Sequence, residues 1–170
     1  MEKNSPLIAM LLLAVAIPFK AHSDERTVHG WVEEAEIYPE AVPVKAKLDT
    51  GALTSSMDAK DVEYFEKGSK KWVRFKVVAK NSDTGQETSQ TFERPLIRKV
   101  KLRGAGGTDH RPVVKMQVCI GQQLLDEEFS LRDRKNMIYP ILFGRKTLDR
   151  IGPVDTRRTF TQQPKCQGAG

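Results

Sequence analysis

Apolar residues that recur at every second position are the feature that most constrains how this chain can fold. Residues 42–48, 73–79 and 114–120 alternate in this way. Successive side chains of a strand point to opposite faces of a sheet, so each segment has one apolar face. Further strands are expected at residues 96–102, 125–131 and 139–143, the last a continuous apolar run that should be buried on both faces. The pattern predicts a mainly β domain.

Turn-forming residues separate these segments and indicate hairpins. They lie at residues 81–86, 104–109, 121–123 and 132–137. Two short helices are also expected. One covers residues 58–65, with Asp58 as its cap and Val62 and Phe65 on its apolar face, and the other covers residues 145–151, ended by Gly152-Pro153.

The first 23 residues are typical of an export signal. Lys3 precedes an apolar run at residues 7–17, and Ala21-His22-Ser23 offers a cleavage site of small residues. The run is shorter than the about 20 residues that a membrane-spanning helix needs, so we expect a periplasmic protein with no stable membrane insertion after signal cleavage. Retention of the segment as an anchor is the alternative. Residues 24–161 would then form the domain and residues 162–170 a flexible tail.

Composition excludes some classes of function. The chain is 39% hydrophobic and carries a net charge of +6, but its basic residues are scattered among acidic ones, without an aromatic stacking surface. We therefore expect no nucleic-acid partner. Cys119 and Cys166 could form one disulfide in an oxidising compartment. Cys119 could equally be a buried small hydrophobic residue, with Cys166 free in the tail, and the sequence does not demand a bond.

The motif with the clearest chemistry is Leu48-Asp49-Thr50-Gly51-Ala52, which follows an alternating strand. An acid at a strand end, followed by a hydroxyl and a glycine, suits the catalytic turn of an aspartic peptidase. The carboxylate must face a second carboxylate, and glycine lets backbone amides approach it. The same three residues also form ordinary surface turns.

A second copy of the triplet, Asp83-Thr84-Gly85, serves as an internal control. Polar residues flank it, and no apolar strand runs directly into Asp83. We interpret it as a hairpin tip. The two copies are too close in sequence for each to belong to its own lobe, since each lobe must bury a core. Asp49 is therefore the catalytic candidate, one per chain.

Three segments together resemble the retropepsin-type aspartic peptidases. They are residues 44–52, the segment Arg111-Pro112-Val113-Val114, and residues 139–145, which include Ile141-Leu142-Phe143-Gly144-Arg145. More closely, they are similar to a bacterial retropepsin-like family that is often labelled as ATP-dependent zinc proteases. The resemblance covers most of residues 28–155.

The resemblance implies a single-lobed acid protease fold with a short C-terminal helix. It also implies a homodimer with one active site, to which each chain supplies its Asp49, and the hydrolysis of peptide or protein substrates at that site. Leu53 departs from the family, where Arg is usual, which leaves the polarity of the cleft open. Residues 104–108 are either a mobile flap tip or a simple hairpin loop, and residues 154–160 are a candidate part of the sheet between subunits. The residues expected to support the site are Thr50 as a hydroxyl grip beneath the aspartates, Gly51 as an amide donor, Ala52 in the cleft wall, and Leu142, Gly144 and Arg145 behind the turn.

The zinc and ATP of that label find little support in the residues. His22, His29 and His110 show no metal-ligand spacing, and residues 104–108 lack the Gly-Lys-Ser/Thr ending of a phosphate loop. We expect no metal and no cofactor. The leading hypothesis is an exported aspartic endopeptidase, and the alternative is a non-catalytic exported β domain that binds peptides or envelope components.

Overall fold

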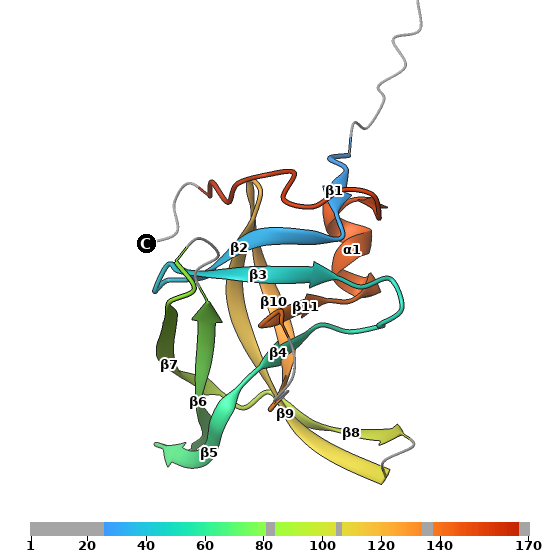
Figure 1. Ribbon diagram of the computed structural model, residues 1–170. Coiled ribbons are helices and arrows are strands. Elements are labelled where there is room, and N and C mark those ends of the chain that lie inside the picture. The colour runs from blue at the N-terminus through green and yellow to red at the C-terminus, as the bar shows by residue number, and fades with distance from the viewer. Residues whose placement is uncertain (1–25, 81–83, 105–106, 134–137, 167–170) are drawn as a thin grey trace, which may run out of the picture.

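The computed structural model describes residues 26–80, 84–104, 107–133 and 138–166. Within these ranges the chain is built almost wholly of strands, with one short helix near its end (Figure 1). None of the described helices has the length and apolar character to cross a membrane. The elements are β1 (His29–Gly30), β2 (Val32–Tyr38), β3 (Val42–Leu48), β4 (Ser56–Asp58), β5 (Lys60–Lys67), β6 (Lys70–Lys80), β7 (Glu87–Pro95), β8 (Arg98–Gly104), β9 (Gly107–Ile120), β10 (Gln123–Arg132), β11 (Ile141–Phe143), α1 (Arg145–Ile151) and β12 (Val154–Asp155).

The largest sheet closes on itself. Its strand order is β10-β4-β11-β3-β2-β9-β8, and β10 also pairs with β9. The short strand β11 lies between β3 and β4, parallel to the first and antiparallel to the second. In this register Phe143 is opposite Leu48. The end of β11 and the end of β3 therefore lie side by side, which is where the candidate site begins.

A second sheet packs against the first and shares its core. It has the order β5-β6-β7, and the apolar side chains of β6 join one buried cluster with those of β2, β3, β9 and β10. Phe75 and Phe92 stack within it with ring centroids 5.7 Å apart. The mainly β fold expected from the alternation is confirmed, and the shared core agrees with the single lobe that the family resemblance implies. The predicted strands at residues 42–48, 73–79, 114–120 and 125–131 lie within β3, β6, β9 and β10.

The predicted helix at residues 58–65 is wrong. This segment continues from β4 into β5, which pairs with β6 through a turn at Gly68, where φ is +62°. The register shifts between Lys60 and Glu63, and Asp61 has φ +52°. Such a bulge adds one residue to the strand and changes the face on which the following side chains lie. Val62 and Phe65, three residues apart, therefore have the spacing of a helix although both lie on a strand. The predicted helix at residues 145–151 is confirmed as α1.

The C-terminal segment differs from a flexible tail over residues 162–166. Cys119 and Cys166 form a disulfide, and the Lys165 amide donates to the Gly121 carbonyl oxygen at 2.6 Å. The buried Glu33 carboxylate accepts hydrogen bonds from the Thr161 amide at 2.8 Å and the Gln162 amide at 3.3 Å. A buried carboxylate is stable only with such partners, so Glu33 and the disulfide hold this segment against the body.

Residues 154–160 pair within the chain. β12 runs parallel to β1, the Trp31 amide donates to the Arg158 carbonyl, and the Phe160 amide donates to the Val32 carbonyl. Over these residues the segment's backbone is bonded to the chain's own N-terminal strands, and its predicted part in a sheet between subunits stays a prediction. The export signal and Asp83 lie outside the described residues.

Candidate active site

Asp49 is the first residue after β3, and both of its carboxylate oxygens have partners. The Gly51 amide donates to Oδ1 at 2.9 Å, and the Lys47 ammonium donates to Oδ2 at 3.2 Å. The side chain of Asp49 is 25% exposed. The predicted role of Gly51 as an amide donor to this carboxylate thus matches the local geometry within one chain.

The environment of Asp49 favours the ionised carboxylate. Partial burial acts to raise the pKa of Asp49, but the Gly51 amide and the Lys47 ammonium outweigh this effect, so the pKa lies below its ordinary value. In a single chain Asp49 is therefore an anion at neutral pH, as the base of an aspartic peptidase must be.

Backbone hydrogen bonds from β11 and α1 fix the turn that carries Asp49. The Asp49 amide donates to the Phe143 carbonyl and the Arg145 amide donates to the Ala52 carbonyl, both at 2.9 Å. The Arg145 guanidinium also donates to the Thr50 carbonyl at 3.0 Å. The structure thus brings the predicted support residue Arg145 to the turn from 95 residues away in sequence.

Gly144 is required where β11 meets the turn, because a side chain has no room there. A Cβ at Gly144 would lie 2.6 to 2.7 Å from the backbone atoms of Thr54. Leu142 is buried and lies opposite Lys47 of β3 and Ser56 of β4 in the sheet. Both residues therefore support the turn by packing and pairing.

A buried hydroxyl pair ties the turn to the helix. Ser55 Oγ lies 2.7 Å from Thr147 Oγ1 and accepts a hydrogen bond from the Gly144 amide at 3.2 Å. Both side chains are almost completely buried. No local sequence pattern indicates this role of Ser55, because its partners lie about ninety residues away.

The apex of the turn faces outward. Thr50 and Gly51 are exposed, Ala52 is half-buried, and the Leu53 side chain is 54% exposed. The grip predicted for Thr50 involves a second copy of the chain and stays a prediction.

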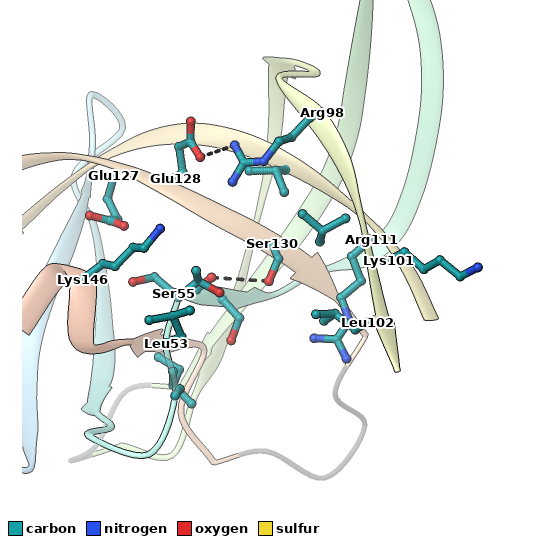
Figure 2. A pocket seen from close by; sticks show the side chains of 16 residues that line it. Leu53, Ser55, Arg98, Lys101, Leu102, Arg111, Glu127, Glu128, Ser130 and Lys146 are labelled. Atoms are coloured by element: carbon teal, nitrogen blue, oxygen red, sulfur yellow. Dashed lines mark hydrogen bonds and ion pairs between the residues drawn. The ribbon is translucent and has the colours of Figure 1, made fainter. Parts of the chain in front are cut away.

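A pocket of about 610 Å³ lies beside the turn, between residues 52–56 and the hairpin of β8 and β9 (Figure 2). It begins at Ala52, and Asp49 is not among its lining residues. Leu102 from β8 and Leu53 from the turn are apolar parts of its wall. Gly104 pairs with Gly107 at the end of this hairpin, residues 105–106 lie outside the described residues, and β8, which leads to them, borders the pocket.

Basic side chains dominate the charge of the pocket wall. The two acidic wall residues, Glu127 and Glu128, are paired with Arg150 and Arg98. Lys101 and Lys146 also line the pocket, and neither forms an ion pair with any residue that the structure describes. Their positions on separate elements explain why no local sequence pattern indicated them.

Metal-binding geometry is absent from the described part of the chain. No three His, Cys, Asp or Glu side chains there are grouped so that they could hold a metal ion. The described residues therefore do not fit the zinc ion that the label "ATP-dependent zinc proteases" implies.

The fold and the braced Asp-Thr-Gly turn define a retropepsin-like protein, and comparison with known families agrees. Residues 28–165 match the model of the RimB-like family, described as "Retropepsin-like aspartic endopeptidase RimB". The chain belongs to this family.

Relatives and solved structures extend the comparison. A crystal structure of Lpg0085, a protein of unknown function (DUF785) from Legionella pneumophila, is similar with a TM-score of 0.66 and 32% identity, covering 80% of this chain and 98% of that one. Two proteins named "Probable alpha-L-glutamate ligase" are also similar. The one from Desulfotalea psychrophila is 30% identical over 70% of this chain, and the one from Parasynechococcus marenigrum is 29% identical over 62%. The chain spans 26% and 22% of their respective lengths.

Replacing Ser55 with alanine should destabilise the protein more than the same change at its neighbour. Ser55→Ala leaves the buried Gly144 amide and Thr147 hydroxyl without their partner, which costs about 1–3 kcal/mol. Ser56 is equally suited as a control because its buried Oγ has no hydrogen-bond partner among the described residues. Ser56→Ala should be neutral or stabilising. Chemical unfolding of both variants measures the difference, and equal losses of stability would show that the Ser55 bonds do not matter.

Proposed function

We propose that this chain is an exported aspartic endopeptidase that works as a homodimer. The observation that carries the proposal is the Asp49 turn, in which an ionised carboxylate is oriented by the Gly51 amide and fixed from behind by β11 and α1. Membership of a retropepsin-like family supports the same chemistry.

Each chain supplies one such turn, so two copies are needed for a pair of carboxylates. Like charges a few ångströms apart do not both ionise easily, and the pair shares one proton. The exposed Thr50 and Leu53 lie on the apex of the turn, on the surface that a second copy would cover. Two-fold symmetry then brings identical patches together.

The shared proton defines the reaction. The ionised Asp49 removes a proton from water, whose oxygen attacks the peptide carbonyl carbon, while the protonated Asp49 of the second copy donates its proton to the carbonyl oxygen. The resulting tetrahedral diol collapses: the C–N bond breaks, the amine nitrogen takes a proton from one aspartate, and the other aspartate recovers the hydroxyl proton. No metal or cofactor takes part in this scheme.

The pocket beside the turn favours substrates with acidic side chains. Lys146 is a cation on its wall that no described residue pairs, whereas the Lys101 side chain points away from the pocket in Figure 2. The relatives named as glutamate ligases point to the same kind of side chain, since the segment shared with this chain occurs within proteins whose name concerns L-glutamate. We propose peptides rich in carboxylates as the substrate class.

Two features support export. The apolar run at residues 7–17 has the length of a signal segment, and the disulfide between Cys119 and Cys166 suits an oxidising compartment such as the periplasm.

Changing Asp49 to asparagine should lower peptide turnover by orders of magnitude at nearly unchanged side-chain volume. Both halves of the proposed pair lose their ionisable group, while asparagine can still accept the Gly51 hydrogen bond. Asp83→Asn is the matched control, because Asp83 begins the second Asp-Thr-Gly copy, which polar residues flank in the sequence. Its effect on stability should stay below about 1 kcal/mol, with turnover unchanged.

Turnover of a mixed peptide library and thermal melting of both variants measure these effects, with a chelator added in parallel. Parental turnover by Asp49→Asn would exclude the aspartic mechanism and favour the non-catalytic peptide-binding domain. Loss of turnover on chelation would favour a metal enzyme.

Acidic peptides should be cleaved in preference to basic ones, and the preference should depend on Lys146. Lys146→Gln should lower kcat/KM for a glutamate-rich peptide by about fivefold, corresponding to about 1 kcal/mol for a partly exposed charge pair. Lys115→Gln is the control, because Lys115 is an exposed cation on β9 that pairs with Asp126 and does not line the pocket. Equal effects of Lys146→Gln and Lys115→Gln, or a preference for basic peptides, would contradict this substrate class.

A further inference from the structure

Lys47 differs from Lys45, the other lysine of β3, in what its side chain contacts. Residues two apart on a strand project from the same face, so Lys47 and Asp49 lie on one side while Leu48 points into the core. The Lys47 ammonium is 3.2 Å from Oδ2 of Asp49. Lys45, two residues earlier, has its ammonium over the Phe160 ring instead, 5.3 Å from the ring centroid.

The other charged groups around the turn have different partners. On α1, the Arg145 guanidinium donates to the Thr50 carbonyl, and Lys146 lines the pocket. On β2, the Glu33 carboxylate is bonded to the C-terminal segment. β11 contributes only the apolar residues of Ile141–Phe143. Among the described residues, Lys47 is therefore the cation that contacts the Asp49 carboxylate.

We propose that Lys47 is a positioning residue that holds Oδ2 of Asp49 and sets the pH range in which the paired aspartates work. The inference rests on the proposed function, since it concerns the same carboxylates. With Gly51 on Oδ1 and Lys47 on Oδ2, the carboxylate plane has a partner at each end. In a homodimer each Asp49 brings its own Lys47 to the pair.

The direction of the effect follows from the charges. A nearby cation stabilises the ionised form of a carboxyl group, and the pKa of Asp49 is lowered in part by Lys47. A second carboxylate has the opposite effect and raises the pKa of the pair. Two ammonium groups offset this repulsion, so both titration steps of the pair occur at lower pH than they would without Lys47.

Replacing Lys47 with methionine should therefore move both limbs of the pH profile of kcat/KM to higher pH. The acid limb marks protonation of the base and the alkaline limb marks loss of the shared proton. At the parent's acid half-maximum the variant should be several-fold slower, while its melting temperature stays close to that of the parent, since a partly exposed ion pair adds little stability. Lys47→Arg keeps the charge and should stay near the parental profile.

Lys45→Met is the matched control, because it removes the same charge from the same strand without touching Asp49. A parental profile for Lys47→Met would overturn the proposal, and so would equal shifts for Lys45→Met and Lys47→Met, which would indicate a general charge effect. Titration of the Asp49 carboxyl carbon by NMR in the full-length protein provides a second readout. An Asp49 titration that does not move to higher pH in Lys47→Met overturns the proposal even if no peptide is cleaved.

The failure of the proposed function looks different. If the proposed function fails, Asp49→Asn retains parental turnover, or the parental protein cleaves no peptide at all. The Lys47 inference fails alone if Asp49→Asn is inactive and Lys47→Met has the parental pH profile.

Discussion

The pairing of β3 with β11 is the constraint on which the rest of the site depends. It sets Phe143 opposite Leu48, so that the Phe143 carbonyl accepts from the Asp49 amide and the first amides of α1 meet the carbonyls of the turn. Gly144 permits this close approach because a Cβ there would collide with Thr54. Without β11 the turn would be an exposed loop. With it, the carboxylate of Asp49 starts from a rigid backbone, which favours catalysis because little reorganisation is needed when the substrate binds.

The electrostatics of the site follow from that backbone. The turn aims the Gly51 amide at one oxygen of Asp49, and strand alternation places the Lys47 ammonium at the other. A lone chain therefore holds a carboxylate that gives up its proton readily. A second Asp49 nearby would make the same group share a proton, so the site in a single chain is only half of an acid–base pair. On the proposed mechanism, a chain with one such turn therefore needs a second copy to complete the pair.

Much of the fold could be predicted from residue alternation, and the limits of that prediction have physical causes. β3, β6 and β9 have clean apolar faces, whereas β7 is rich in polar residues and carries one fully buried side chain, Phe92. The apolar residues of β5 have helical spacing in the sequence, and the bulge at Asp61 accommodates that spacing on a strand. The disulfide could not be predicted either, because the proximity of Cys119 and Cys166 depends on how the C-terminal segment returns to β2 and β9. For the site, sequence motifs indicated Asp49 and Arg145. The Ser55–Thr147 bond and the basic pocket wall could not be predicted, because each joins segments that are distant in the sequence.

The central claim is that two Asp49 residues from two chains form one site, and subunit mixing tests it most directly. Parental protein and Asp49→Asn protein are unfolded together in different proportions, refolded, and assayed for peptide turnover at constant total protein. If each site needs both aspartates, turnover follows the square of the parental fraction, and an equal mixture retains about a quarter of parental turnover. Turnover that falls in direct proportion to the parental fraction, to about half in the equal mixture, would contradict the shared site and show that each chain acts alone.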